Sequence, residues 1–337
     1  MSEARSTPTR TVIVCAYTLD RLALTVRCLD SVLAQDPKPD QVLAVIDHNE
    51  ELERSLADRF AGNVEVIANS GPQGLSSARN TGIAAARGDL IMFIDDDAEP
   101  APGWLAGLDA AFREPSVAIA GGRANAVWQV AKPAWFPDEY LWVVGCSYRG
   151  QPTSGDVRNP LGCNMAFRRL VFDTIGGFHP AVGRLGTLPI GAEETELCLR
   201  ARREIAGSRV ILVEGAEVNH VVGPERSRIG YFVRRCFYEG VSKAVLRDLA
   251  EGDALATERS YVLRTLTSAA GRRLGRAARR DQPVGQIAGI GALGIGVASA
   301  VAGYAYGRIR TRARGGVAAG DAPAPLPLPH DPGTGVS

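Results

Sequence analysis

The stretch Gly88–Trp104, "GDLIMFIDDDAEPAPGW", decides how the rest of the sequence is interpreted. Its apolar run, Leu90–Ile94, is typical of a strand buried on both faces, and it leads directly into Asp95, Asp96 and Asp97. Three adjacent carboxylates repel one another, so three aspartates at a strand end indicate a bound cation. The stretch therefore predicts a buried strand whose carboxyl end holds a cation.

Strand-like and helix-like segments alternate on the N-terminal side of this stretch. The predicted strands are "TVIVCAY", "QVLAVID" and "VEVIANS", and the predicted helices between them are "RLALTVRCLDSVLAQ", "EELERSLADRF" and "SSARNTGIAAARG". Strands joined by helical crossovers predict an α/β fold with a mostly parallel sheet flanked by helices on both faces.

Sheets of this kind bind ligands at the carboxyl ends of their strands. Tyr17 follows the first strand, Asp47 follows the second, and the three aspartates follow the fourth. These positions are therefore candidate ligand contacts, although Asp47 is also compatible with an ordinary helix N-cap or turn.

The middle of the chain is less regular than its beginning. The segment "WFPDEYLWVVGCSYRGQP" combines aromatic residues with prolines and indicates a specificity region wrapped on the sheet. Further along, "GAEETELCLRARR" and "IGYFVRRCFYEGVSKAVLRDLA" predict helices, and "SRVILVEGAEVNHVV" predicts one strand that leads to His220. We expect a catalytic domain over 10–250, preceded by a flexible N-terminus over 1–9.

The C-terminal part of the chain differs sharply in charge from the rest. Arg259–Arg314 contains eleven arginines and one acid, Asp281, so it carries +10 while the remainder of the +1 chain carries about −9. The segment 259–281 predicts a basic amphipathic helix, and Val284–Tyr306 has no charge but six glycines.

This pattern predicts a helical, membrane-associating segment over 251–314, with a soluble packing helix as the alternative. The arginines flank an apolar run and lack interleaved aromatic residues, so a membrane surface with anionic lipids is expected and nucleic acid is not. The Pro/Gly-rich residues 315–337 are expected to be disordered.

The six cysteines show no C-x-x-C spacing, and the polar N-terminus lacks a signal-peptide core. We therefore expect reduced core cysteines and a cytoplasmic protein at the inner face of the plasma membrane.

The ordered set of motifs resembles glycosyltransferase family 2, which has the Rossmann-like GT-A fold. The similarity covers roughly residues 10 to 245 and rests on "VIVCAY", "VIDHNE", "GPQGLSSARNTGIAAARGDLIMFIDDD", "NPLGCNMAFRR" and "GAEETELCLR". It implies a nucleotide-sugar donor, UDP- or GDP-linked, a divalent metal (Mn or Mg) held by the D-x-D element, and inversion by direct displacement.

The resemblance and the chemistry agree on the metal ligands. A departing nucleoside diphosphate develops negative charge, which a divalent ion with hard oxygen ligands can neutralise. If the segment stays extended, Asp95 and Asp97 point the same way and Asp96 points elsewhere. His220 resembles the late metal-ligand histidine of some family members, with a structural histidine as the alternative reading.

An inverting transfer also needs a base for the acceptor hydroxyl. Glu194 in "AEETELCLR" stands where the family has its aspartate, and Glu193 is the alternative base. The pair could instead stabilise a helix N-terminus through its dipole.

The remaining assignments follow from the same resemblance. Asp47 is expected to accept from the nucleotide base, Tyr17 to stack against it, and the loop "SGPQGLSSARN" to bring backbone amides and an arginine to the nucleotide. Arg234, Arg235 and Tyr238 could close over the diphosphate or form a solvated helix face. The expected donor contacts are Tyr17, Arg21, Asp47, Gly74, Arg79, Asp95, Asp96 and Arg235, and the expected acceptor contacts are Trp142 and Asn164.

Two functions from different classes remain open in the sequence. The first is a transferase that builds a cell-envelope or extracellular glycan on a glycan or lipid-linked acceptor. The second is a non-catalytic nucleotide-sugar-binding scaffold that keeps the fold without turnover.

Overall fold

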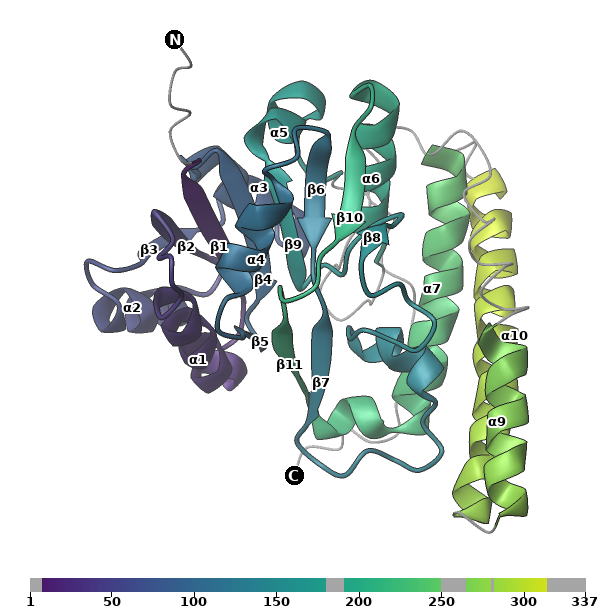
Figure 1. Ribbon diagram of the computed structural model, residues 1–337. Helices are drawn as coiled ribbons and strands as arrows, with labels where there is room; N and C mark the ends of the chain where they lie inside the picture. Colours follow the sequence, from purple (N-terminus) through teal and green to yellow (C-terminus); the bar gives the residue numbers. More distant parts are fainter. Residues whose placement is uncertain (1–7, 180–190, 250–264, 280–281, 314–337) are drawn as a thin grey trace.

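The computed structural model describes residues 8–179, 191–249, 265–279 and 282–313, and an eight-stranded sheet lies at its centre (Figure 1). The strand order is β3 (Glu65–Ala68), β2 (Gln41–Ile46), β1 (Arg10–Ala16), β4 (Leu90–Asp95), β9 (Asn164–Arg168), β6 (Val117–Gly121), β10 (Arg209–Leu212) and β8 (Gly155–Asp156). Strands β1 to β4 are parallel, whereas β9 runs antiparallel to both of its neighbours. The mixed, mostly parallel sheet confirms the predicted fold class.

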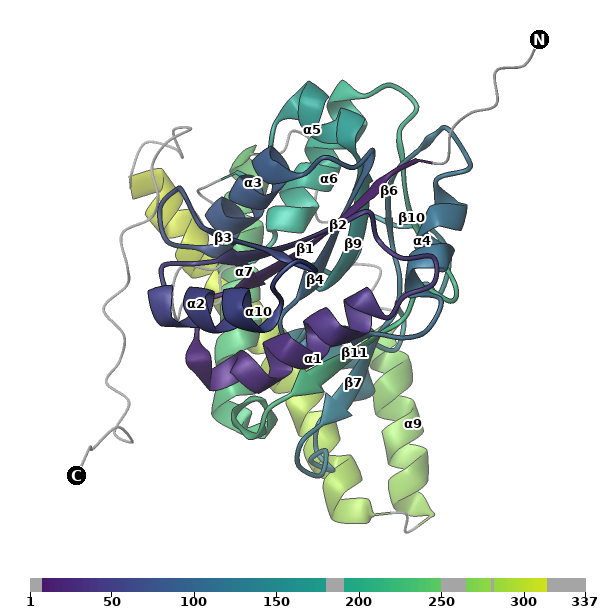
Figure 2. The same ribbon diagram turned by 90° about the vertical axis from the view of Figure 1, so that its left-hand side faces the viewer.

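Helices cover both faces of this sheet (Figure 2). One apolar cluster contains residues of α1 (Leu22–Leu33), α2 (Glu50–Arg59) and α4 (Trp104–Ala111), and the other contains residues of α3 (Leu75–Ala85), α5 (Arg169–Ile175) and α6 (Glu193–Glu204). In β1, Val12 and Val14 belong to the first cluster and Ile13 to the second, as the alternation of a strand requires.

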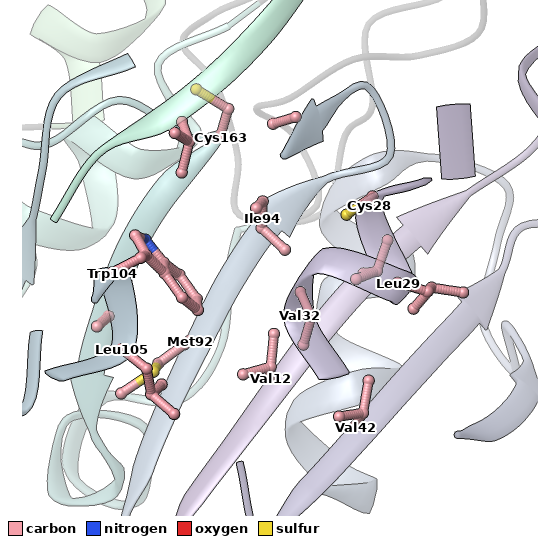
Figure 3. Packing of buried hydrophobic residues seen from close by; sticks show 14 of the residues in the cluster. Val12, Cys28, Leu29, Val32, Val42, Met92, Ile94, Trp104, Leu105 and Cys163 are labelled. Atoms are coloured by element: carbon pink, nitrogen blue, oxygen red, sulfur yellow. The ribbon is translucent and has the colours of Figure 1, made fainter. Parts of the chain in front are cut away.

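The first cluster packs closely beneath the strands. Figure 3 shows Leu29 and Val32 from α1 and Trp104 from α4 around Val12 and Met92 of the central strands. All five side chains are buried. Helices α1 and α4 therefore pack on β1 and β4, the strands that lead to candidate ligand positions.

A second, three-stranded sheet lies below the carboxyl end of β4 in Figure 1. It consists of β5 (Ala98–Pro100), β11 (Val218–Val222) and β7 (Ala124–Trp128), in that order. The prediction of one continuous strand up to His220 is therefore wrong. The chain turns at Gly215, which has φ +84°, and passes from β10 in the large sheet to β11 in the small one.

The C-terminal helices lie against the rest of the protein. Helix α10 (Pro283–Ala313) runs beside α7 (Ile229–Leu249), and α9 (Thr267–Ala278) packs against α10 (Figure 1). A Cβ added at Gly240 of α7 would collide with the backbone of Ala300, and one added at Gly303 would collide with the backbone of Phe237. The two helices therefore touch backbone to backbone, and α10 is not detached from the unit that ends near 250.

These helices agree only in part with the expected segments. The uncharged run 284–306 is helical, while the amphipathic helix expected from residue 259 is described only from residue 265. Residues 1–7 and the expected disordered tail lie outside the described residues. The six cysteines are free thiols, and all except Cys15 are buried.

Asn164, expected at the acceptor, lies in the interior instead. Its Oδ1 accepts from the Trp104 indole at 2.9 Å, and its Nδ2 donates to the carbonyls of Arg123 and Ala216 at 3.1 and 2.8 Å. The side chain is fully buried and joins α4 to β9 and to the start of the small sheet. The structure does not support an acceptor-binding role for this residue.

Candidate active site

The end of β4 carries the candidate metal ligands. β4 stops at Asp95, and a two-residue turn through Asp96 and Asp97 leads into β5. Because β5 pairs with β11, Ala98 lies opposite His220. One ligand atom from each of Asp95, Asp97 and His220 lies within 4.8 Å of the other two. Three residues that are far apart in the sequence thus form one cluster, as predicted.

Cationic side chains surround this cluster. Arg21 Nη1 lies 3.0 Å from Asp96 Oδ1 and 3.1 Å from Asp97 Oδ2, and Arg226 Nη2 lies 3.0 Å from the same Asp97 oxygen. Burial, and then repulsion from Asp97, raises the pKa of Asp96 to about 7. Arg21 thus contacts the carboxylates of Asp96 and Asp97. The Asp96 carboxylate points to Arg21 and is not one of the three candidate metal ligands.

Arg226 is a further residue of this site that was not expected from the sequence. This arginine is buried in a short 3-10 helix, Pro224–Ser227, just beyond β11. The available signal was its position six residues after His220, where a chain that leaves β11 is still close to the carboxylates.

His220 is fully enclosed between two partners. Its Nε2 lies 3.1 Å from Asp97 Oδ1, and its Nδ1 lies 3.5 Å from Cys146 Sγ. Burial alone would lower the pKa of His220, but the Asp97 carboxylate outweighs burial and raises it to about 10. Histidine is thus a cation here, and it balances the charge of the aspartates.

The donor set fits a divalent ion. Two carboxylates and one imidazole suit Mn²⁺, and an imidazole whose second nitrogen has its own partner is the usual arrangement of a metal-binding histidine. An ion held by Asp95, Asp97 and His220 would take the place of the proton on His220. Asp95, Asp97 and His220 therefore could hold a divalent metal ion.

A buried arginine connects this cluster to α6. Arg79 of α3 lies 3.0 Å from Glu193 Oε1 and 3.5 Å from Asp95 Oδ1, and it donates to the Gly162 carbonyl at 3.2 Å. It was expected beside the nucleotide, but its guanidinium is buried and already bound to two acids. Arg79 therefore fixes the start of α6 relative to the end of β4.

The two glutamates at the start of α6 have different surroundings. Glu193 is buried and held by Arg79, whereas Glu194 is half-buried and receives no hydrogen bond from another side chain among the described residues. Burial, and then the charge of Glu193, raises the pKa of Glu194 to about 8. Of the two glutamates, Glu194 is thus the one that is not held by Arg79.

The carboxyl end of β2 carries a small hydrogen-bond network around Asp47. The Asp47 carboxylate accepts from Asn69 Nδ2 at 2.7 Å, from the Gly74 N–H at 2.9 Å and from His48 Nδ1 at 2.9 Å. Gly74 has φ +141°, a conformation that favours glycine. Asp47 therefore holds the loop that opens α3, and the Gly74 amide, expected at the nucleotide, points to Asp47.

The other predicted contacts lie around this centre. Tyr17 is 51% exposed, with the Arg21 guanidinium 5.8 Å from its ring centroid, so its ring is open to a ligand. Arg235 pairs with Glu239 of the same helix at 3.3 Å and lies beside Gly191 at the entry to α6. Trp142 is half-buried in the 3-10 helix η2 (Asp138–Val144), against Tyr140.

Comparison with known proteins points to one family. The sequence model of the family described as "Glycosyl transferase family 2" matches residues 11–176. The glucosyl-dolichyl phosphate glucuronosyltransferase of Haloferax volcanii is 34% identical over 255 residues, which are 74% of this chain and 81% of that protein. The pre-mycofactocin glycosyltransferase of Mycobacterium tuberculosis is 26% identical over 190 residues, but the match spans only 38% of it.

Two solved structures share the fold. The mannosyltransferase PcManGT from Pyrobaculum calidifontis, in complex with GDP-Man and Mn²⁺, has a TM-score of 0.54 at 20% identity, covering 92% of this chain and 88% of that one. GalNAc-T7 with UDP, GalNAc and Mn²⁺ has a TM-score of 0.51 at 17% identity, covering 76% and 54%.

The raised pKa of Glu194 predicts a pH-dependent effect on stability. Folding raises this pKa from 4.5 to about 8, so the native state binds more protons than the unfolded state between these values. The Glu194 carboxylate therefore destabilises the fold increasingly as the pH rises through this window. Glu194→Gln should be stabilised relative to the parent by an amount that grows from pH 4.5 to pH 8, measured by urea unfolding.

Glu51→Gln is the matched control, because it removes an exposed first-turn carboxylate of α2. Its difference from the parent should stay nearly constant over the same pH range. A constant difference for Glu194→Gln would show that this carboxylate is not strained by the fold.

Proposed function

The chain belongs to glycosyltransferase family 2, and we propose that it is an inverting, metal-dependent enzyme that transfers a sugar from a nucleoside diphosphate to a lipid-linked or glycan acceptor. The observation that carries the proposal is the arrangement of two acidic centres. Asp95, Asp97 and His220 form a candidate metal site, and Arg79 links it to Glu193, beside the available carboxylate of Glu194.

Glu194 is our choice for the general base. An acceptor hydroxyl loses its proton to this carboxylate while its oxygen attacks the anomeric carbon, and the bond from that carbon to the diphosphate breaks. A base is most effective when its pKa lies near the working pH, and the pKa of about 8 meets this condition. Glu193, which pairs with Arg79, holds the adjacent Glu194 in position.

In this proposal, the cluster of Asp95, Asp97 and His220 stabilises the leaving diphosphate. A divalent ion, when bound, supplies positive charge to the departing diphosphate. Arg21 and Arg226 now contact Asp97 and would be released in part toward the phosphates, because the ion would compete for the same carboxylate. Both guanidinium groups would then act as phosphate donors at the same strand end.

The strand ends β1 and β2 provide the nucleotide side. We assign Tyr17 to stacking on the base and Asp47, with Gly74, to its recognition. Asp47 can accept one further hydrogen bond because each carboxylate oxygen carries two lone pairs. Relatives of the fold have structures with UDP or with GDP-Man, so either nucleotide is a candidate donor for this chain.

A lipid-linked acceptor is the more specific part of the proposal. The name of the Haloferax relative includes a dolichyl phosphate, which is a membrane lipid, and it supports an acceptor of this class. Such an acceptor requires the enzyme to work at a membrane, and we place this enzyme at the cytoplasmic face of the plasma membrane, in synthesis of a cell-envelope or extracellular glycan.

Helix α10 supports this location. Among the described residues, Pro283–Arg310 is a helix long and apolar enough to cross a membrane. Its exposed positions all carry apolar residues or glycine and include Val284, Ile287, Ile295, Val301 and Ile309. Exposed arginines at the end of α9, Arg276 and the following Arg279, suit anionic lipid headgroups, and α9 packs against α10.

The packing of α10 favours a flat orientation over a spanning one. Its inner face lies along α7, which carries Arg234, Arg235, Glu239 and Lys243. A spanning α10 would draw these charges into hydrocarbon or break the contact between the helices. We therefore propose that the outer face of α10 lies in the lipid interface.

The metal site predicts that Asp97 is essential. Asp97→Asn keeps the shape of the side chain but removes the charge that would hold the ion, so turnover should fall by roughly a hundredfold or more. The assay is release of nucleoside diphosphate from UDP- and GDP-sugars with Mn²⁺. Asp95→Asn, at a less buried position, separates loss of the ion from loss of the fold, and full activity of both variants or in excess chelator would rule out the metal.

The base assignment predicts a second kinetic effect. Glu194→Gln should lower kcat by roughly a hundredfold with little change in the donor KM, because only basicity is lost. In the parent, the rate should rise with pH toward about 8 as Glu194 ionises, and this limb should be absent from the variant. If Glu193→Gln has the kinetic effect instead, the base is Glu193, and donor binding without any turnover in the parent would favour the scaffold.

The membrane proposal predicts which surface binds lipid. The double variant Ile287→Glu, Val301→Glu places charges on side chains that are 61% and 63% exposed, so affinity for anionic vesicles should fall about tenfold or more. Leu170→Glu, at an equally exposed apolar residue of α5, should bind as the parent does. A parent chain with no affinity for anionic vesicles would contradict the proposal.

A further inference from the structure

The 3-10 helix η2 and the two residues after it lie between α10 and the candidate metal site. We propose that Tyr140 of η2 is a positioning residue, through which α10 sets the affinity of the site for a divalent ion. This inference rests on the proposed function, because it requires an ion at Asp95, Asp97 and His220. Tyr140 itself touches neither the ion nor the substrate in this proposal.

Tyr140 is clamped by α10. Its hydroxyl donates to the Leu293 carbonyl at 3.2 Å, and its ring lies directly on Gly296, where an added Cβ would be 2.5 Å from ring carbon Cε1. The side chain is buried, and Phe232 of α7 packs against it with ring centroids 5.1 Å apart. The ring therefore cannot move without moving the helix.

The other end of η2 is fixed to the turn that follows it. The Gly145 N–H donates to the Trp142 carbonyl, and the Cys146 N–H donates to the Leu141 carbonyl, each at 3.0 Å. Gly145 has φ +83°, which favours glycine, and so the turn has one defined shape. A shift of Tyr140 is therefore transmitted to Gly145 and Cys146.

The end of η2 and this turn contact His220 and Arg226, two residues that pair with the Asp97 carboxylate. Cys146 Sγ lies 3.5 Å from His220 Nδ1, and a Cβ on Gly145 would be 3.1 Å from His220 Cε1. The Val144 carbonyl accepts from Arg226 Nη1 at 3.4 Å. The turn thus sets the orientation of the His220 ring and the position of Arg226 at the same time.

The orientation of a ligating histidine depends on such outer partners. Their removal commonly weakens metal affinity by about 10- to 100-fold without loss of any ligand. A displacement that starts at Gly296 and passes through Tyr140 should act in the same way. The C-terminal helix would then contribute to ion binding although it carries no ligand.

Two alanine substitutions in the same helix test this inference. Gly296→Ala forces a methyl group against the Tyr140 ring, whereas Gly294→Ala places its methyl group in open space, with no atom within 4 Å. Both give the same gain in helix propensity, so they differ only in the contact with η2. Binding of Mn²⁺ to the full chain without donor is followed by electron paramagnetic resonance of the free ion.

We expect Gly296→Ala to raise the Mn²⁺ dissociation constant about tenfold and Gly294→Ala to leave it unchanged. Circular dichroism confirms the fold of each variant. If Gly296→Ala does not fold, Tyr140→Phe takes its place, and an increase in the Mn²⁺ dissociation constant is expected because the bond to the Leu293 carbonyl is lost. Equal Mn²⁺ affinity of the folded variant and the parent would overturn the inference and leave the metal site standing. A parent that does not bind Mn²⁺ would overturn both.

Discussion

Three carboxylates can end a buried strand only if cations reach them, and this requirement organises the structure. Asp96 and Asp97 are almost fully buried, where an unpaired charge would cost several kcal/mol. Arg21 comes from a 3-10 helix after β1 and Arg79 from α3, while His220 comes from β11 and Arg226 from the 3-10 helix that follows β11. The acids therefore hold together segments that are otherwise distant in the sequence.

The same requirement explains the second sheet. Pairing of β5 with β11 brings His220 within reach of Asp97, and the pairing of β11 with β7 fixes β11 from its other side. The stretch recognised by the family sequence model ends at residue 176, so it contains the aspartates but neither His220 nor Glu194. The site is completed by the part of the chain beyond this match.

Sequence periodicity was sufficient for β1 to β4 and for the acidic residues at the edge of the sheet, whereas β6, β8 and β9 of the same sheet were not anticipated. Strands β1 to β4 each contain an uninterrupted apolar run. Asp95 and Glu194 are chemically conspicuous near element ends, and so are Asp97 in the turn after β4 and His220 within β11. The structure differs from the sequence-based expectations where contacts between distant parts of the chain decide the outcome. Arg79, expected at the nucleotide, and Asn164, expected at the acceptor, are buried by partners 60 or more residues away, and no local pattern reveals such burial. The strand expected up to His220 breaks at Gly215, whose φ of +84° turns the chain out of the large sheet, and Arg226 has no periodic signal at all.

The backbone contact between α7 and α10 also bears on how this family can diversify. Gly240 and Gly303 each face the backbone of the other helix with no room for a side chain, so neither position accepts a larger residue while the helices stay in contact. Relatives that carry the C-terminal helix should therefore retain small residues at both positions together, while relatives without it are free of this restriction. Acquisition of the helix would be difficult to reverse, because its loss would bare a glycine-marked groove and an aromatic cluster that includes Tyr140 and Phe232. Paired glycines of this kind would mark a lineage in which a peripheral helix became part of the enzyme.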